Sequence, residues 1–583
     1  MGAKEACEVR TIGIGHQDFG KIITDDIFYV DKTDFIREWW ENQDCVTLIT
    51  RPRRFGKTLT MSMVEQFFSV KYADGGRNFQ GLSIWQYEKF RSLQGTYPVI
   101  SLSFASVKEK DYRETRRKIC QILVNVYNQY DFLLEADCLT EKEKEFFRSV
   151  SIDMGETEAT MALNQLSLYL MKYYGKKVMI LLDEYDTPMQ EAYLHGYWED
   201  AAFFMRSLLN ASFKTNPFME RAILTGITKI SKESIFSDLN NLEIVTTTSD
   251  KYASCFGFTE EEVFAALKEY DLYEAKEAVK FWYNGFTFGE VSDIYNPWSI
   301  LNYLEKRRLA AYWANTSSNS FAGSLLQTGS ARLKADFERL LQGKILETEI
   351  NEQIVFDQLG QDETAVWSLL LAAGYLKIKD YHAGMTEYGE WKEVYRLELT
   401  DFEVKVMFRN MIRSWFKPVD TEYNDFIRAM LRDDLDSMND YMNSIALAVF
   451  SCFDTGNHPS GKAQPERFYH GFVLGLMVEL SGRYRITSNR ESGYGRYDVM
   501  LEPQNTEDDA ILLEFKVYDS RREKSLEETV ARALDQINSE RYTVLLEAAG
   551  ITADRIRSYG FAFQGKRVLI GGGRHADYRT SDT

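Results

Sequence analysis

The sequence predicts an α/β protein of more than one domain, and three observations support this expectation. The chain has 583 residues, which is more than one hydrophobic core normally serves. In the first half, short apolar runs alternate with stretches of helical periodicity, a pattern typical of a mainly parallel sheet with helical crossovers. Near the C-terminus, two strand-like runs lie between helical stretches and indicate a second, smaller α/β domain. We expect domains at residues 1–290, 291–410, 411–455 and 456–583.

Composition argues against several classes of protein. Hydrophobic residues make up 44% of the chain and charged residues 27%, as in ordinary globular proteins. The six cysteines and six histidines are scattered, without a C-x-x-C pair, so we expect reduced thiols and neither a disulfide framework nor a His/Cys metal site. The N-terminus lacks a basic-then-apolar signal, and the apolar runs are too short to span a bilayer. We therefore expect a cytoplasmic protein that does not contact a membrane.

The stretch TLITRPRRFGKTLTMSMVEQFF, which starts at Thr47, has the pattern of a strand, a loop and a helix. Residues 45–50 are apolar and β-branched, whereas residues 59–70 carry apolar side chains at helical spacing. The loop between them resembles a phosphate-binding loop, except that Arg51 stands where the first glycine of such a loop is expected. Pro52 stiffens the start of this loop.

The end of this loop carries the residue types that hold a nucleotide phosphate. Gly56 allows the backbone to approach closely, Lys57 places a charge beside the β and γ phosphates, and Thr58 offers a hydroxyl to Mg²⁺. The other loop residues expected at this site are Arg53, Arg54 and Phe55, and Arg51, Arg53 and Arg54 are expected to add positive charge to the loop.

A second apolar strand ends in two carboxylates. Residues 178–182 form the apolar run, and Asp183 and Glu184 follow directly. Because the run has no polar alternation, we expect it to be buried on both faces, as in a parallel sheet. Asp183 would then hold the Mg²⁺ shell, and Glu184 would polarise the water that attacks the γ phosphate.

Two more strands are expected in the same sheet, at residues 97–104 and 220–228. The second ends in polar residues, and we expect Thr225 and Lys229 to sense the γ phosphate from a neighbouring strand. For Lys229, an ordinary surface lysine is an equally good interpretation.

These motifs together resemble the AAA-ATPase-like family of bacterial proteins. The resemblance extends from about residue 8 to about residue 300 and rests on FYVDKTDFI (28–36), RPRRFGKTL, LLDEYDTP, ILTGITKISKESIFSDLNNL (223–242) and FWYNGFTF with YNPWSIL (281–301). An arginine at the position of Arg51 is usual in that family. The resemblance implies binding and hydrolysis of ATP with Mg²⁺.

The middle of the chain indicates a lid. Residues 291–410 show helix, helix, short strand pair and helix in order, which suggests a small helical or winged-helix-like lid. Winged helices either bind DNA or only pack, and the acidic surroundings favour packing. Residues 411–455 have the pattern of amphipathic helices that connect the lid to the C-terminal domain.

The C-terminal region contains a hairpin that carries acids and a lysine. Its strands are expected at residues 496–503 and 510–519, with an acidic turn between them. Glu514 and Lys516 are two residues apart and therefore share one face, and Asp498 lies on the partner strand. Asp498 and Glu514 would bind Mg²⁺, and Lys516 would orient or activate the water that attacks a phosphodiester. An exposed Glu514–Lys516 salt bridge is the structural alternative.

The flanking helices complete a recognisable pattern. A helix, two strands with Asp and Glu-x-Lys, and a helix with Gln536 is the arrangement of PD-(D/E)xK nucleases, and the segment resembles the nuclease-like domain that accompanies the AAA-ATPase-like domain. The resemblance implies Glu466 on the leading helix as an auxiliary acid, although an acid there also favours the helix dipole. Gln536 would be an auxiliary residue of the same site.

Charge is unevenly distributed along the chain. The net charge is −19, but residues 456–583 carry 18 basic and 19 acidic side chains. Arg483, Arg485, Arg490 and Arg496 lie close together, which is compatible with a polyanion at this region or with a solvated surface. We expect nucleic acid as the partner of this domain, DNA rather than RNA.

Three hypotheses of function follow from these motifs. The first is an ATPase that gates or moves a Mg²⁺-dependent nuclease, used in defence or in processing of mobile elements. The second is a nucleotide-switched binding protein that does not cut, and the third is an ATPase scaffold with a vestigial C-terminal domain. A homo-oligomer is possible under each hypothesis, with Arg206 or Arg221 as a candidate arginine finger.

Overall fold

The computed structural model divides into two compact units. Unit 1 comprises Met1–Thr328 and Arg339–Met407, and unit 2 comprises Gly329–Glu338 and Phe408–Thr583. The structure describes residues 9–229, 235–236, 239–313, 322–323, 325–326, 330–351, 359, 362–385, 389, 391–415, 424–449, 473, 477, 480, 483–492, 495–505, 508–519, 521–539, 542–564 and 567–574.

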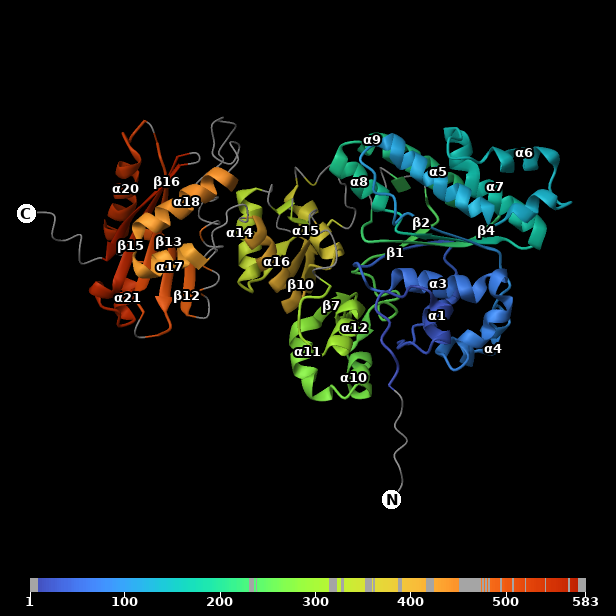
Figure 1. Ribbon diagram of the computed structural model, residues 1–583, viewed down its shortest axis with the longest axis horizontal. Coiled ribbons are helices and arrows are strands. Elements are labelled where there is room, and N and C mark those ends of the chain that lie inside the picture. Colours follow the sequence, from blue (N-terminus) through green and yellow to red (C-terminus); the bar gives the residue numbers. More distant parts are fainter. Residues whose placement is uncertain are drawn as a thin grey trace, which may run out of the picture. The chain divides into compact units, whose positions relative to one another are not determined.

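Unit 1 is built on a five-stranded sheet in the order β2-β3-β4-β1-β5 (Figure 1). Its strands are β1 (Val46–Thr50), β2 (Val99–Ser103), β3 (Val178–Asp183), β4 (Met219–Gly226) and β5 (Leu242–Val245). All neighbouring pairs are parallel, which confirms the predicted sheet. Since β4 lies between β1 and β3, the carboxyl ends of the phosphate-loop strand and the acidic strand flank the end of β4.

Helices cover both faces of this sheet (Figure 1). On one side lie α1 (Phe19–Thr24), α3 (Lys57–Phe68) and α4 (Glu88–Arg91), and on the other α5 (Tyr112–Asn128), α7 (Glu156–Tyr174), α8 (Thr187–His195) and α9 (Trp198–Leu209). Every residue of β3 is buried, as its uninterrupted apolar sequence predicts for a strand covered on two faces. The last residue of β3, the polar Asp183, lies at the carboxyl edge of the sheet.

Unit 1 continues with two smaller sheets and further helices. The first sheet consists of β6 (Phe258–Thr259), β7 (Asn284–Phe288) and β8 (Val291–Tyr295), and the second of β9 (Leu346–Thr348), β10 (Leu376–Met385) and β11 (Trp391–Leu399). The helices are α2 (Asp34–Asn42), α6 (Glu141–Ser149), α10 (Glu260–Glu269), α11 (Lys276–Tyr283), α12 (Pro297–Lys306) and α15 (Glu363–Ala372). The antiparallel hairpin β10–β11 follows α15 and lies where the sequence predicted a short strand pair, and the lid itself stays a prediction. Two more helices, α14 (Ala331–Leu341) and α16 (Phe402–Trp415), contain residues of both units.

Unit 2 is a mixed five-stranded sheet in the order β12-β13-β14-β15-β16. Its strands are β12 (Tyr484–Ser492), β13 (Gly495–Pro503), β14 (Ala510–Val517), β15 (Ile556–Gln564) and β16 (Arg567–Arg574). The β14–β15 pair is parallel and the other pairs are antiparallel. The predicted hairpin is thus formed by β13 and β14, and the predicted second α/β domain is confirmed.

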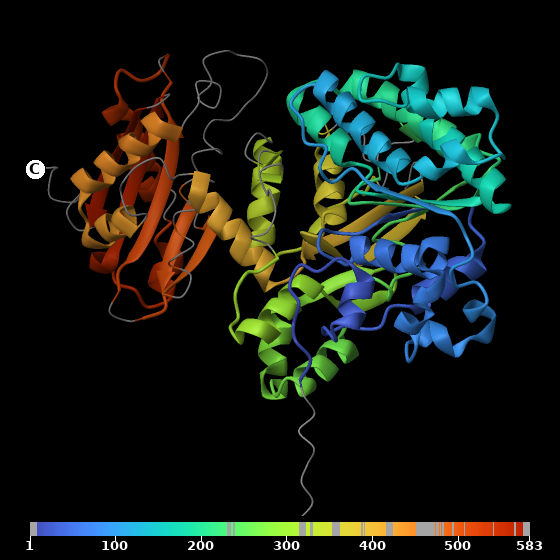
Figure 2. The same cartoon turned by 45° about the vertical axis from the view of Figure 1, so that its right-hand side comes forward.

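Two helical layers enclose the unit 2 sheet (Figure 2). On one face α17 (Asn424–Arg432) and α18 (Leu435–Val449) pack against Leu513 and Phe515, and on the other α20 (Leu526–Ser539) and α21 (Val544–Ala548) pack near Leu512. Within the segment 411–455, expected as a connector, α17 and α18 contribute buried side chains to the core of unit 2. By strand alternation Glu514 faces the α20 side, away from Leu513 and Phe515.

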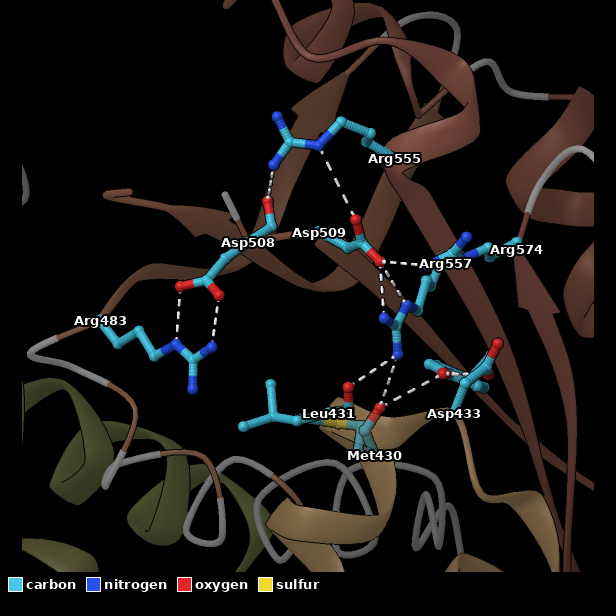
Figure 3. A network of polar contacts seen from close by, with 10 residues as sticks. Met430, Leu431, Asp433, Arg483, Asp508, Asp509, Arg555, Arg557 and Arg574 are labelled. Carbon is cyan, nitrogen blue, oxygen red and sulfur yellow. Dashed lines mark hydrogen bonds and ion pairs between the residues drawn. The ribbon is translucent and has the colours of Figure 1, made fainter. Parts of the chain in front are cut away.

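An arginine and aspartate network fixes the turn between β13 and β14 (Figure 3). Arg483 makes a bidentate ion pair with Asp508, and Arg557 donates to Asp509 at 2.8 and 2.6 Å. Arg557 also donates to the carbonyl oxygens of Met430 at 3.3 Å and Leu431 at 3.0 Å, at the end of α17. The acidic turn thereby joins the sheet to one of its helical layers.

No helix in the described part of the chain is long and apolar enough to cross a membrane.

Candidate active sites

The phosphate loop of unit 1 runs from the end of β1 into α3. Gly56 begins this helix with a φ of 83°, a left-handed conformation that favours glycine. The ammonium group of Lys57 donates to the carbonyl oxygens of Arg51 at 2.8 Å and Pro52 at 2.9 Å. Burial lowers the pKa of Lys57, although the carboxylates of Glu184, Asp183 and Asp186 act in the opposite direction. The lysine is thus held within the curve of the loop.

Asp183, at the end of β3, contacts side chains from the start of α3 and the end of β4. One carboxylate oxygen accepts a hydrogen bond from the Thr58 hydroxyl at 2.7 Å, and the other accepts from the Thr225 hydroxyl and from the Glu184 amide at 3.1 Å. The predicted residues Thr58, Asp183 and Thr225 are therefore brought together. A hydroxyl beside a carboxylate is an oxygen donor pair that suits Mg²⁺, so the residues present fit this ion.

Glu184 has an unusual backbone conformation. Its φ is 51°, in the left-handed region that non-glycine residues rarely adopt, and its carboxylate accepts a hydrogen bond from the Thr187 hydroxyl at 3.0 Å. A residue is kept in such a conformation only when its surroundings determine it, and these conformations cluster at functional sites. Its assigned role as the base remains a prediction.

Asp186 is a site residue that the sequence reasoning missed. It is buried, and it accepts hydrogen bonds from the amides of Ile227 at 3.0 Å and Thr228 at 2.9 Å. Burial raises the pKa of Asp186, and these amide donors act against that rise. The sequence feature that could have identified Asp186 is the second aspartate of the motif D-E-Y-D. Asp186 fixes the segment that leaves β4 directly after Thr225.

Lys229 lies beyond this segment and lines a cavity together with Thr50, Thr246–Thr248 and Ser368. The hydrogen bonds that gather Thr58 and Thr225 around Asp183 do not include Lys229. A γ-phosphate-sensing role for Lys229 remains a prediction.

Arg51 differs from the expectation that it adds charge to the loop. Its side chain is buried, and its guanidinium donates to the carbonyl oxygens of Thr246 at 2.5 Å and Lys251 at 3.3 Å. The guanidinium carbon also lies 4.4 Å from the centre of the Phe288 ring. Arg51 therefore points into the interior, and its charge is used to anchor the loop.

The other loop residues are held by segments far along the chain. The Asn296 side chain donates to the Arg53 carbonyl at 3.3 Å, and the exposed Arg54 guanidinium lies 4.2 Å from the centre of a Trp298 ring. The Phe55 ring packs edge-on against Phe286 and Phe288. An added Cβ at Gly374 would lie 2.7 Å from Pro52, so the turn after α15 also touches the loop.

The structure argues against Arg221 as an arginine finger. It is 8% exposed, and its guanidinium donates to the carbonyl oxygens of Trp39 at 3.1 Å and Trp40 at 2.7 Å. It lies near the start of β4, at the opposite end of this strand from Thr225. A finger must reach a neighbouring nucleotide, which this buried side chain does not do. Arg206 lies in the last turn of α9, and its role is untested.

Asp498, Glu514 and Lys516 meet on the α20 side of the unit 2 sheet. The Asp498 carboxylate accepts a hydrogen bond from the Phe515 amide at 2.9 Å, and the Lys516 ammonium donates to Glu514 Oε1 at 2.8 Å. Glu514 is 1% exposed, and among the described residues none donates a hydrogen bond to its Oε2. The Glu514–Lys516 contact exists, as the structural alternative expected, but the glutamate is buried and not an exposed edge.

Burial and the neighbouring Asp498 carboxylate raise the pKa of Glu514 to about 8, and Lys516 acts against this rise. A buried carboxylate with one oxygen lacking a donor and a second carboxylate beside it is an arrangement that a divalent cation would stabilise. The residues present therefore fit Mg²⁺. In the described part of the chain, no group of three or more acid, histidine or cysteine side chains forms a metal site.

The auxiliary residues are less clearly placed. The Gln536 side chain donates to the Tyr542 hydroxyl at 3.0 Å, and the contacts described above for Asp498, Glu514 and Lys516 do not include it. Glu466 lies outside the described residues, as do the side chains of Arg490 and Arg496. Arg483 is paired with Asp508, and Arg485 lies 3.5 Å from Glu502, so acids partly neutralise these two arginines.

The two sites define two classes of domain. A phosphate loop joined to an acidic strand end across a parallel sheet defines a P-loop nucleotide-binding domain, and Asp with Glu-x-Lys on a helix-flanked hairpin defines a PD-(D/E)xK nuclease-like domain. Residues 13–236 match a family model described as a predicted AAA-ATPase, and residues 464–572 match a model of the PD-(D/E)XK nuclease superfamily. The chain thus carries an AAA-ATPase-like domain and a PD-(D/E)XK nuclease superfamily domain, as the motifs predicted.

The chain is also similar to a protein of Azotobacter chroococcum mcd 1 described as an uncharacterized protein in the vnfD 5′ region. The two are 26% identical over 415 residues, which cover 70% of this chain and 71% of that protein. The similarity therefore spans more of the chain than either domain alone.

Proposed function

We propose that the protein binds and hydrolyses ATP in unit 1 and cleaves phosphodiester bonds of nucleic acid in unit 2, each with Mg²⁺. The observation that carries the proposal is Asp183, whose two oxygens accept hydrogen bonds from Thr58 and Thr225. These side chains come from the ends of three segments that the sheet order places side by side. The same convergence is what binding of a nucleotide triphosphate with its metal requires.

In unit 1, Lys57 would contact the phosphates from its position within the loop, and the amides at the start of α3 would surround them. Thr58 and Asp183 would hold Mg²⁺, which supplies charge neutralisation between the β and γ phosphates. Glu184 would accept a proton from the attacking water, and Thr225 would keep the Asp183 carboxylate in place.

In unit 2, Asp498 and Glu514 would hold Mg²⁺, which supplies a water of lowered pKa and polarises the phosphodiester. Lys516 would orient that water and stabilise the charge that develops on the phosphate. The near balance of basic and acidic side chains in residues 456–583 is compatible with a polyanion, and we propose DNA rather than RNA as that polyanion.

ATP turnover is tested with two variants in unit 1. Lys57→Ala should abolish nucleotide binding, whereas Glu184→Gln should keep binding and lose turnover, because only the base is removed. Lys110→Ala, at an exposed lysine of the same unit, serves as the matched control and should behave as wild type. Full turnover in Glu184→Gln would exclude that residue as the base.

Cleavage is tested by Mg²⁺-dependent nicking of plasmid DNA. Wild type should nick and Lys516→Ala should not, whereas Lys524→Ala, at an exposed lysine of the same unit, should retain activity. Nicking by wild type in the presence of EDTA would contradict the proposed metal dependence.

One observation favours the second candidate, a nucleotide-switched protein that binds nucleic acid without cutting. Burial and the Asp498 carboxylate raise the pKa of Glu514 to about 8, so Mg²⁺ would compete with a proton for this carboxylate near neutral pH. DNA binding by wild type without nicking, at pH 7 and at pH 9 with Mg²⁺ present, would select this candidate.

A further inference from the structure

The backbone at Arg51 does not need a glycine. Among the described non-glycine residues, those with positive φ include Arg54 at 67° but not Arg51. The first position of this loop therefore has a conformation that any residue adopts without strain. Another constraint must fix the path of the loop at this point.

Arg51 supplies that constraint through its backbone amide, its backbone carbonyl and its guanidinium. Its amide donates to the Gly226 carbonyl at the end of β4 at 3.2 Å, and its own carbonyl accepts from Lys57 at 2.8 Å. Its guanidinium donates to the carbonyls of Thr246 and Lys251, in the segment that follows β5. One residue thus joins the phosphate-contacting lysine to the strands on both sides of β1.

Burial of the Arg51 guanidinium is unfavourable in free energy, so we infer that this side chain has a specific role. Burial lowers the pKa of Arg51 to about 9, and no carboxylate pairs with it among the contacts of the described residues. Its buried Nε also lacks a hydrogen-bond partner in the described part of the chain. A merely structural interior would tolerate an apolar side chain at lower cost.

We propose that Arg51 is the positioning residue of the phosphate loop: its anchored guanidinium fixes the carbonyl oxygens that hold Lys57, and thereby sets this lysine for the nucleotide phosphates. The part that concerns the nucleotide rests on the proposed function. The planar fork is essential because one guanidinium donates to the carbonyls of Thr50, Thr246 and Lys251 while it lies over the Phe288 ring. Restoring the glycine of a standard loop should therefore weaken the site.

The test compares Arg51→Gly and Arg51→Lys with Arg221→Lys in the full-length protein. Arg221 is a matched control because it is also a buried guanidinium that donates to two carbonyls and lies over an aromatic ring, Trp40, at 4.3 Å. The first measurement is hydrogen exchange of the loop amides without nucleotide. The second is the Kd for a fluorescent ATP analogue with Mg²⁺, and thermal unfolding monitors the fold of each variant.

Both Arg51 variants should speed amide exchange in residues 53–58 and weaken nucleotide binding roughly tenfold to a hundredfold, as misplacement of a positioned group does. Arg221→Lys should lower the melting temperature without either change. Unchanged loop exchange in the Arg51 variants, or equal effects in Arg221→Lys, would overturn the proposal, as would nucleotide binding by Arg51→Gly as tight as wild type. Should wild type bind no nucleotide, the proposed function fails, and the exchange measurement still decides whether Arg51 fixes the loop.

Discussion

The buried Glu514 makes a prediction about the pH dependence of unit 2. Its pKa is raised from the ordinary 4.5 to about 8, first by burial and then by the Asp498 carboxylate. Because the folded state holds this proton more tightly than the unfolded chain does, the stability that the proton contributes is fully present below pH 4.5. This stability is lost progressively as the pH rises to about 8.

The magnitude follows from the pKa difference. A rise from 4.5 to about 8 corresponds to roughly 5 kcal/mol of unfolding free energy, lost across this pH window. For a unit of this size, such a loss lowers the melting temperature by about 10 °C or more. Glu514→Gln has no proton to lose, so its stability should change far less between pH 5 and pH 9.

The assay is calorimetric unfolding of the full-length protein in EDTA from pH 5 to pH 9, with the unit 2 transition assigned by hydrogen exchange of β14. Glu502→Gln is the matched control, because it makes the same change on the same sheet at a partly exposed glutamate beside Arg485. Added Mg²⁺ should stabilise wild type at high pH but not Glu514→Gln. If the melting temperature of unit 2 changed with pH equally in wild type and Glu514→Gln, the reasoning would be refuted.

Three further predictions concern residues that support the two sites. Thr225→Val should reduce ATP turnover roughly fivefold by removing one hydrogen bond to Asp183, and unchanged Mg²⁺ dependence of turnover would contradict the shared site. Asp186→Ala should destabilise unit 1 by about 1 to 3 kcal/mol in urea unfolding, because the amides of Ile227 and Thr228 lose their acceptor. Asp509→Asn should destabilise unit 2 by about 3 kcal/mol by leaving the buried Arg557 without its carboxylate, and a loss below 1 kcal/mol would show that the network in Figure 3 is dispensable.

Much of the architecture could be predicted from local patterns. The strand before Asp183 could be recognised because an apolar run without alternation is buried on both faces, and the loop ending in Lys57 could be recognised by its residue types. The proximity of Thr58 to Asp183 follows from the parallel sheet, since parallel strands place their carboxyl ends at one edge. Asp498 and Glu514 could be placed on one hairpin for a different reason, because two strand-like runs flank a short acidic turn.

Other features depend on contacts that no local pattern contains. The interior position of Arg51 is set by carbonyls at Thr246 and Lys251, about 200 residues later in the chain. The role of Asp186 depends on amides that follow β4, which become neighbours only when the sheet forms. Residues 411–455 have amphipathic periodicity that fits either a connector or a core layer, and only the sheet they cover distinguishes the two.

The contacts of the loop from Arg51 to Phe55 show how far the AAA-ATPase-like region depends on later parts of the chain. Its anchoring partners at Thr246, Lys251 and Gly374 all come later than residue 236, where the match to the AAA-ATPase family model stops. A fragment that ends at residue 236 would keep every residue expected to touch a phosphate. It would lose the later groups that hold these residues in position. The phosphate loop and the later segments that anchor it therefore form one structural unit, and exchange of this region between relatives should succeed only when the later segments are exchanged with it.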